Sequence, residues 1–368
     1  MPVPPQRDPE LTRAVLGRWL TAAARPAEIR LGPITVPRSA GFSAEILLCD
    51  AEWSESGTTR TEPLVVRVAP TGHRVFPEDR WAEQVRLQAL LAATDVPVPE
   101  ILFHEPSGEL LGAPFVVMRR VRGLVPADLP SYHREGWLAD LPEPARAEVW
   151  WGGVRMLARL HRLDPAELGL HFLSRPEYGP VGVGQQLREY QEHLGFYGAA
   201  GNPVAQAALS WLREHRPAEP HAPRLLWGDA RLGNIVFAGT EPAAVLDWEM
   251  AALGQPEADL AWFLHLDRHL SEGIGAERLP GLPGRAETVA RYEELAGRPV
   301  RSLEYYEVFA AFRFCVATAR VTRLLTESGV LPPGTEVPLH RNATALLDRV
   351  LAERAPAAAV SNTRPSRL

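Results

Sequence analysis

The segment that decides the fold of this protein is residues 225–259, which read LLWGDARLGNIVFAGTEPAAVLDWEMAALGQPEAD. Asp229 and Asn234 are separated by Ala-Arg-Leu-Gly, a composition typical of a loop. Residues 235–237 then predict a strand, residues 238–242 a turn, and the residues after the turn a returning strand. We therefore expect a β-hairpin that directly follows a polar loop.

This hairpin is expected to bring two oxygen donors together. Asn234 and Asp247 are symmetric about the predicted turn, so an in-register hairpin places them side by side, with Asp229 on the loop just before. A single aspartate in a loop is usually a cap or turn residue. The full pattern is more specific, because Trp-Gly-Asp-x4-Asn is followed by the hairpin, by Leu-Asp-Trp-Glu and then by Asp259. Mg²⁺ takes one or two protein oxygens and completes its octahedron with waters and phosphates, so Asn234 and Asp247 are predicted metal ligands.

These motifs resemble those of the aminoglycoside phosphotransferase and choline kinase superfamily, relatives of the protein kinases. The segment looks closest to the branch that contains bacterial phosphotransferases and the kinase-like domains joined to acyl-CoA dehydrogenases. The resemblance extends over about residues 30–350 and implies an ATP- and Mg²⁺-dependent kinase for a small-molecule hydroxyl acceptor. It implies that Asp229 is the catalytic base and that Asn234 and Asp247 hold Mg²⁺, which agrees with a reaction governed by positioning and charge neutralisation.

The resemblance extends to two further residues of this segment and fails at a third. Arg231 lies where related kinases often carry a basic residue, so it is a predicted catalytic contact to the transferring phosphate, with a salt bridge as the equal alternative. Asp259 matches an aspartate that braces the catalytic loop, a structural role. Trp227 replaces the family's usual histidine, which predicts altered packing with the chemistry retained.

The N-terminal third of the chain predicts a mostly β lobe with an inserted helix. Strands are expected at residues 34–36, 45–52, 64–68, 100–104 and 114–121, and helices at residues 9–24 and 81–93. After a proline-rich loop at residues 124–144, helical patterns predominate, including one at residues 149–162. This order predicts an α+β, bilobal, protein-kinase-like fold with a nucleotide-binding lobe (1–120), a catalytic and substrate lobe (121–353) and a disordered tail (354–368).

The N-terminal lobe supplies the predicted nucleotide contacts. Arg67 is the basic residue within the β-branched run that predicts the strand at residues 64–68, and its planar guanidinium can bind a phosphate group with two hydrogen bonds. Glu83, on the next helix, is its expected partner. The alternative is an arginine on a solvated strand face. Residues 39–43, SAGFS, lie where a phosphate-covering loop belongs, so Ser43 is a predicted phosphate contact.

An interlobe hinge is predicted at residues 115–123, by resemblance to the family. Backbone groups near Arg119 and Val121 would read the adenine edge, and Met118 would line the pocket behind, with a core methionine as the equal alternative. His161, in a helical motif that resembles one in the family, is expected to be a core histidine with satisfied hydrogen bonds.

The composition narrows the class of protein. A net charge of −6 argues against a nucleic-acid surface. Cys49 and Cys315 lie in apolar runs and are expected to be buried free thiols. The N-terminus lacks the apolar core of a signal peptide, and the apolar windows are too short to span a bilayer, so we expect a cytoplasmic protein without a membrane partner.

The acceptor is left open by the sequence. Candidates are a hydroxylated metabolite, a hydroxyacyl thioester, an aminoglycoside, or a Ser/Thr side chain in a peptide. The residues after Asp259 do not form the acidic wall that a polycation needs; they are Trp262, His265, Asp267, Arg268 and His269. A rival from another class is a nucleotide-binding pseudokinase that acts as a scaffold, which an absent base or metal ligand would favour. An ATP-dependent hydrolase or ligase lacks its signature here, since the chain has neither a G-x4-G-K-[ST] loop nor a G-x-S-x-G elbow.

Overall fold

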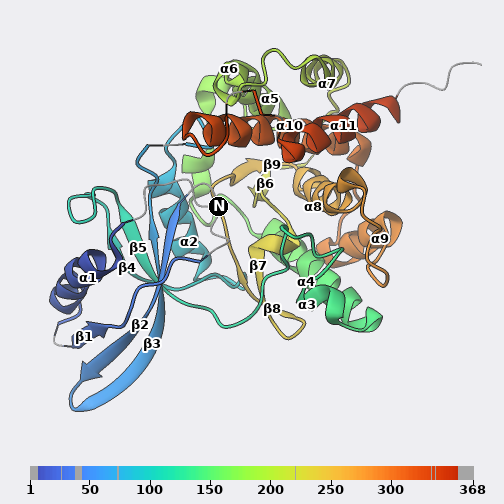
Figure 1. The fold of residues 1–368 in the computed structure, drawn as a ribbon. Helices are drawn as coiled ribbons and strands as arrows, with labels where there is room; N and C mark the ends of the chain where they lie inside the picture. The colour runs from blue at the N-terminus through green and yellow to red at the C-terminus, as the bar shows by residue number, and fades with distance from the viewer. Residues whose placement is uncertain are drawn as a thin grey trace, which may run out of the picture.

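The fold separates a small sheet from a larger helical lobe (Figure 1). The structure is a computed structural model, and it describes residues 7–25, 27–37, 44–72, 74–219, 221–332, 334–335 and 337–354. The sheet is antiparallel and five-stranded, in the order β1-β2-β3-β5-β4. Its strands are β1 Glu28–Leu31, β2 Glu45–Glu55, β3 Thr58–Val68, β4 Ile101–Glu105 and β5 Phe115–Arg119. The predicted α+β architecture is confirmed.

Helix α1, Pro9–Ala23, covers one side of this sheet. It begins at Asp8, whose side chain accepts hydrogen bonds from the amides of Glu10 and Leu11, and its first residue is a proline. Leu16 and Leu20 are fully buried in the same apolar cluster as the core residues of β3 and β5. Helix α2, Trp81–Leu91, is the predicted insertion between β3 and β4. The amphipathic pattern thus fixes which face of each element meets the sheet.

One predicted strand of this lobe is wrong. Residues 34–36 contribute only an isolated bridge between Thr35 and Leu48, and the edge strand is β1 instead. Pro33 and Pro37 flank the predicted run, and proline cannot donate a hydrogen bond to a strand ladder. The short alternation of buried and exposed residues in β1 was the missed signal.

The C-terminal lobe is mainly helical. Its α-helices are α3 Trp137–Asp140, α4 Glu143–Arg162, α5 Val183–Glu192, α6 Leu194–Tyr197, α7 Pro203–Glu214, α8 Glu257–Leu270, α9 Arg285–Ala296, α10 Leu303–Glu327 and α11 Pro338–Ala352. Single 3₁₀ turns are η1 Leu170–Leu173, η2 Pro176–Tyr178, η3 Leu232–Asn234 and η4 Glu272–Ile274. Helix α10 packs against α7, α8 and α11 at the centre of this lobe. None of the helices in the described part of the chain is long and apolar enough to cross a membrane.

Two small sheets lie inside this helical lobe and carry residues 225–259. Strand β6, Arg224–Leu226, pairs with β9, Ala252–Gly254, and β7, Ile235–Ala238, pairs with β8, Glu241–Val245. Helix α4 packs closely against this segment, because a Cβ at Gly152 would lie 2.9 Å from the Pro242 ring and 3.1 Å from the Phe237 ring. The loop between β6 and β7 is therefore held on a rigid base. Cys49 and Cys315 are both free and buried, as predicted.

Candidate active site

The β7–β8 hairpin does not have the register that symmetry about the predicted turn requires. The turn is shorter than predicted, because Ala238 already pairs with Glu241. A bulge next to Val236 then adds one residue to β8, which accords with Pro242, a residue that cannot donate to the ladder. As a result the Leu246 amide donates to the Asn234 carbonyl at 2.8 Å. Asp247 consequently lies one residue beyond the position opposite Asn234.

Asp247 is held in an uncommon backbone conformation just after the hairpin. Its φ of 60° is in the left-handed region, which few non-glycine residues adopt. The indole Nε1 of Trp227 donates to the carbonyl of Leu246 at 2.8 Å and to that of Asp247 at 3.2 Å. The tryptophan that replaces the expected histidine therefore holds the backbone at Asp247, the predicted metal ligand. The sequence alone did not reveal this role.

Three side-chain donors surround the carboxylate of Asp229. Its Oδ1 accepts a hydrogen bond from Trp262 Nε1 at 2.8 Å, and its Oδ2 accepts from Asn234 Nδ2 at 2.7 Å and from Arg231 Nε at 3.0 Å. Burial, together with the negative charge of Asp247, raises the pKa of Asp229 to about 7, against the opposing effect of the hydrogen bonds from Trp262 and Asn234. Asp229 and Asn234, predicted to act together, are in direct contact.

The amide of Asn234 is oriented by these contacts. Its Nδ2 donates to the side chain of Asp229 and also to the Asp229 backbone carbonyl, at 3.0 Å. The amide oxygen therefore points away from Asp229 and remains available as a ligand. Amide and carboxylate oxygens are the donors that Mg²⁺ prefers, so Asn234 and Asp247 have the chemistry that this ion needs.

Asp259 braces the loop that carries Asp229, as predicted. Its carboxylate accepts hydrogen bonds from the amides of Trp227 at 2.6 Å and Gly228 at 2.9 Å. His161 Nε2 lies 3.1 Å from the same carboxylate, and its Nδ1 lies 2.8 Å from the hydroxyl of Tyr292, so the core histidine is satisfied on both sides. Gly228 has a φ of 87°, and a Cβ there would overlap the Met250 carbonyl, so only glycine fits this turn.

Two residues of this site were missed in the sequence. Arg313 on α10 is buried, donates from Nη2 to the Gly228 carbonyl at 3.1 Å and lies with its guanidinium 4.6 Å from the Trp262 ring centroid. The signal was an arginine that interrupts an apolar helix. Asp128, in the loop after the hinge, forms an ion pair with Arg231. Arg231 forms salt bridges with Asp128 and with Asp229, the predicted base. Burial lowers the pKa of the Arg231 guanidinium.

Arg67 reaches the C-terminal lobe. Its Nη2 lies 3.7 Å from Asp247 Oδ1, and its guanidinium lies 5.1 Å from the Trp81 ring centroid. The expected pair between Arg67 and Glu83 is not formed: Glu83 lies 3.7 Å from Arg175. Glu83 instead belongs to a cluster of ion pairs between the start of α2 and the C-terminal lobe. The other members of this cluster are Arg175, Glu78, Arg80 and Glu189. Burial raises the pKa of Glu83.

The predicted hinge, residues 115–123, begins with strand β5 and continues beyond its end at Arg119. Met118 is buried and accepts a hydrogen bond from Gln88 at 3.1 Å, the environment of a core methionine. The amide of Arg119 donates to the Glu100 carbonyl at 2.9 Å, so this N–H is not free to read an adenine edge, and its side chain forms ion pairs with Glu62 and Glu100. Val121 lies two residues beyond the end of β5. Ser43 lies outside the described residues.

Comparisons with known proteins agree on one family. The sequence model of the phosphotransferase enzyme family matches residues 53–297. Acyl-CoA dehydrogenase family member 11 of Gallus gallus is 32% identical over 205 residues, which are 55% of this chain and 25% of that protein. Family member 10 of Mus musculus is 28% identical over 263 residues, 68% of this chain and 23% of that protein. The chain therefore spans about a quarter of the length of these relatives.

Solved structures show the same fold. A Ralstonia eutropha protein assigned to the aminoglycoside phosphotransferases has a TM-score of 0.66 at 22% identity, with 92% of this chain and 97% of that chain covered. A thermostable mutant of the aminoglycoside phosphotransferase APH(4)-Ia has a TM-score of 0.58 at 16% identity, with 93% and 99% covered. The predicted α+β, protein-kinase-like fold and the resemblance found in residues 225–259 are confirmed. The chain belongs to the phosphotransferase enzyme family.

Proposed function

We propose that this phosphotransferase moves the γ-phosphoryl group of ATP to a hydroxyl group of a small molecule, with Mg²⁺ as the cofactor. The observation that carries this proposal is the convergence of Arg67 from the sheet with Asp229, Asn234 and Asp247 from the helical lobe. One cation and three oxygen-bearing side chains meet at the boundary of the lobes, where a nucleotide would lie. The APH(4)-Ia neighbour is a ternary complex with AMP-PNP and hygromycin B, which supports nucleotide use in this fold.

The proposed reaction assigns one role to each side chain. The acceptor oxygen forms a bond to the γ-phosphorus, the bond to the β,γ-bridging oxygen breaks, and ADP leaves. Asp229 orients the acceptor hydroxyl and takes its proton, for which a pKa raised to about 7 is well matched to neutral pH. When bound, Mg²⁺ would neutralise charge on the phosphates, and its positive charge would act on the pKa of Asp229 in the opposite direction to Asp247.

Arg67, Asn234 and Asp247 would position the reactants. Asn234 would offer its amide oxygen to the metal while its amide nitrogen fixes the carboxylate of Asp229. Arg67 would exchange its contact with Asp247 for the nucleotide phosphates, to which its planar fork can donate two hydrogen bonds. Most of the rate enhancement in phosphoryl transfer comes from such positioning and electrostatic stabilisation.

Calorimetric titration with ATP in the presence of Mg²⁺ or EDTA tests the nucleotide half of this proposal. We expect affinity to fall strongly in EDTA and in the Asp247→Ala variant, because both remove the metal bridge. Equal ATP affinity in Mg²⁺ and in EDTA would contradict the proposal. The acceptor half is tested by screening a metabolite library for compounds that gain the mass of one phosphate only when ATP is present.

A further inference from the structure

The first residue of α2 lies against the arginine that is proposed to hold phosphate. Trp81 begins α2, and Arg67 is the last residue but one of β3. The guanidinium carbon of Arg67 lies over the Trp81 ring, 5.1 Å from its centroid. Trp81 is 5% exposed and the Arg67 side chain 14%, so water is largely excluded from this contact. A cation over the face of a tryptophan is attracted by the ring, and the attraction is strongest where water is excluded.

The expected carboxylate partner of Arg67 is engaged elsewhere. Glu83 lies on the same helix as Trp81, but its Oε2 is 3.7 Å from Nη2 of Arg175 in the C-terminal lobe. The residue of α2 that contacts Arg67 in the described structure is therefore Trp81. An aromatic face stands where a carboxylate was expected.

Contacts of the residues just before Trp81 hold its ring in place. Arg80 forms ion pairs with Glu78 and with Glu189 on α5. The backbone amide of Trp81 donates a hydrogen bond to Asp79 Oδ1 at 3.0 Å. The ring itself belongs to the buried apolar cluster of the sheet. The indole is therefore fixed relative to both lobes.

An aromatic ring orients an arginine without neutralising it. A carboxylate partner would offset the positive charge and occupy N–H groups at one edge of the guanidinium, whereas a ring contacts the flat face and leaves the edges free. The contact between Arg67 Nη2 and Asp247 Oδ1, at 3.7 Å, is too long for a hydrogen bond. The edge of the Arg67 guanidinium can therefore donate two hydrogen bonds to a phosphate group.

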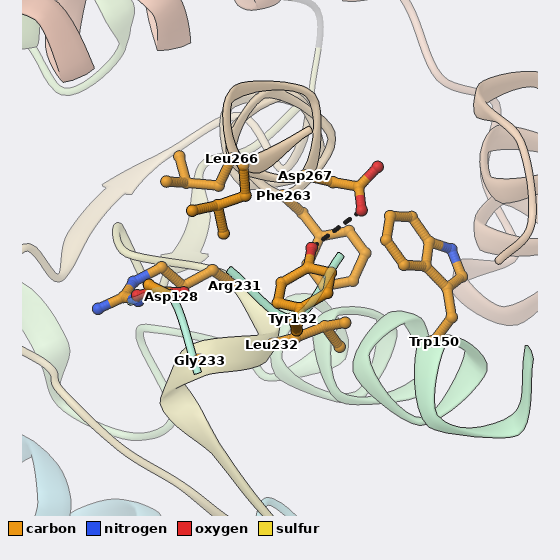
Figure 2. Close-up of a pocket in the computed structure, with 10 residues that line it drawn as sticks. Asp128, Tyr132, Trp150, Arg231, Leu232, Gly233, Phe263, Leu266 and Asp267 are labelled. Atoms are coloured by element: carbon orange, nitrogen blue, oxygen red, sulfur yellow. Dashed lines mark hydrogen bonds and ion pairs between the residues drawn. The ribbon is translucent and has the colours of Figure 1, made fainter. Parts of the chain in front are cut away.

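The arginine next to Asp229 is held in a different way. Figure 2 shows Arg231 beside Asp128, with which it forms an ion pair, and Arg231 Nε lies 3.0 Å from Asp229 Oδ2. Two carboxylates thus offset the charge of Arg231, while the indole leaves that of Arg67 available. Of these two arginines, Arg67 is the one whose surroundings suit a phosphate contact.

The ring of Trp81, and not its N–H group, makes the contact. Nε1 of Trp81 is buried and has no hydrogen-bond partner among the described residues. A phenylalanine at this position would therefore lose no hydrogen bond of the described structure and would keep an aromatic face. This property allows the role of the ring to be tested by a conservative substitution.

We propose that Trp81 is a positioning residue for phosphoryl transfer: its ring takes the place of the helix carboxylate and holds the Arg67 guanidinium, with its charge available, toward the phosphates of the nucleotide. The inference rests on the proposed function for the identity of the ligand. The role of the ring can nevertheless be measured by nucleotide binding alone, without turnover.

A double-mutant cycle on AMP-PNP binding tests this inference. Trp81→Leu removes the aromatic face and Trp81→Phe keeps a weaker one; each is made in the wild type and in Arg67→Ala, and affinity is measured by calorimetry with Mg²⁺. We expect Trp81→Leu to raise the dissociation constant roughly tenfold, the equivalent of about 1.4 kcal/mol, and Trp81→Phe to raise it less. In Arg67→Ala the same substitutions should change it by less than about twofold.

Two controls separate positioning from support of the fold. Trp53→Leu should leave AMP-PNP affinity unchanged, although Arg60 lies over the Trp53 ring at the same distance, 5.1 Å. Adenosine, which has no phosphate group, should bind equally to the wild type and to Trp81→Leu in saturation-transfer NMR. If Trp81→Leu does not fold, Trp81→Phe in the two backgrounds decides the same question.

The outcomes distinguish this inference from the proposed function. A loss of affinity in Trp81→Leu that is as large for adenosine as for AMP-PNP, or as large in Arg67→Ala as in the wild type, would overturn the positioning role. Weaker AMP-PNP binding in Arg67→Ala, without any loss in either Trp81 variant, would overturn this inference alone. AMP-PNP binding that is absent in the wild type or unchanged in Arg67→Ala would overturn the proposed nucleotide site and the inference with it.

Discussion

The indole of Trp227 holds the backbone at Asp247, with Nε1 donating to the carbonyls of Leu246 at 2.8 Å and Asp247 at 3.2 Å. The left-handed φ of Asp247, 60°, is a conformation that costs free energy for a residue other than glycine and persists only when its surroundings impose it. Asp259 fixes the Trp227 amide at 2.6 Å from the other side. Trp227 thus connects Asp259, which fixes its amide, to Asp247, the proposed metal ligand.

Trp227→Phe should therefore impair metal-dependent nucleotide binding and not only stability. The variant keeps a buried ring but leaves carbonyl oxygens without their donor, a loss of about 1–3 kcal/mol in the free energy of unfolding. Trp248→Phe is the matched control, because Trp248 is 2% exposed and its Nε1 has no hydrogen-bond partner within the described residues. Calorimetry with Mg-ATP and thermal melts check both variants. Equal ATP affinity in the two variants would show that the indole does not position Asp247.

Asp229→Asn should remove most acceptor-dependent turnover. An amide cannot take the acceptor's proton, and a general base contributes about 10²–10⁴-fold. In either orientation the amide NH₂ would face a donor, Trp262 Nε1 on one side or Asn234 Nδ2 and Arg231 Nε on the other, so we expect a moderate loss of stability, about 1–3 kcal/mol. ADP release at saturating Mg-ATP and acceptor measures the effect. A variant that keeps more than about a third of the wild-type rate would exclude Asp229 as the base, since a base contributes at least about 10²-fold. A pseudokinase would have no such turnover to lose.

Arg67→Ala should chiefly weaken ATP binding, because a phosphate contact is lost and Asp247 loses its neighbouring cation. A hydrogen bond to a charged group contributes about 1.5–3 kcal/mol, so the dissociation constant should rise by roughly 10- to 100-fold. Arg60→Ala is a suitable control, because Arg60 lies on the same strand but contacts Trp53 and Glu62. Unchanged ATP affinity in Arg67→Ala would contradict the placement of the phosphates next to β3.

The buried histidines of α8 should make the protein acid-sensitive. Burial lowers the pKa of His265 to about 3 and that of His269 to about 4, whereas an unfolded histidine titrates near about 6.5. Below about pH 6.5 the unfolded state binds protons that the folded state does not, so the free energy of unfolding decreases as the pH is lowered, by about 2 kcal/mol for His265 at about pH 5.

His265→Leu should flatten this acid limb, because leucine does not titrate and His265 Nε2 has no hydrogen-bond partner in the described structure. Urea unfolding between about pH 5 and 8 measures the effect, with the exposed His171→Leu as the control. If the acid limb of His265→Leu were as steep as that of the wild type, His265 would not be the titrating group.

Local sequence patterns determined most of the secondary structure of the N-terminal lobe and the loop of the candidate site. The apolar periodicity predicted α1, α2 and most strands of the N-terminal sheet, and the residues between Asp229 and Asn234 predicted a loop. The contact between these two side chains is a finding of the structure. The brace from Asp259 followed from its place in the family motif. Such features depend on residues close in the chain, whose propensities and turns fix local geometry with little help from distant segments.

The tertiary structure decided which charged side chains meet. Arg67 contacts Asp247 instead of the expected Glu83, and Arg231 pairs with Asp128, about a hundred residues earlier in the chain. An arginine can reach several carboxylates at similar energetic cost. The choice among them therefore depends on how the lobes pack and not on the local sequence.

The register of the β7–β8 hairpin was also decided by the folded structure and not by the local sequence pattern. Symmetry about the predicted turn placed Asn234 opposite Asp247, but the shorter turn and the bulge in β8 place Asp247 one residue further on, where Trp227 and Arg67 contact it. The residue types of the site could be predicted from the chain, because hard oxygen donors and a base are what phosphoryl transfer needs. The hydrogen-bond and ion-pair partners of these residues could not be predicted, because register, burial and ion pairing are settled only when segments distant in the sequence pack together.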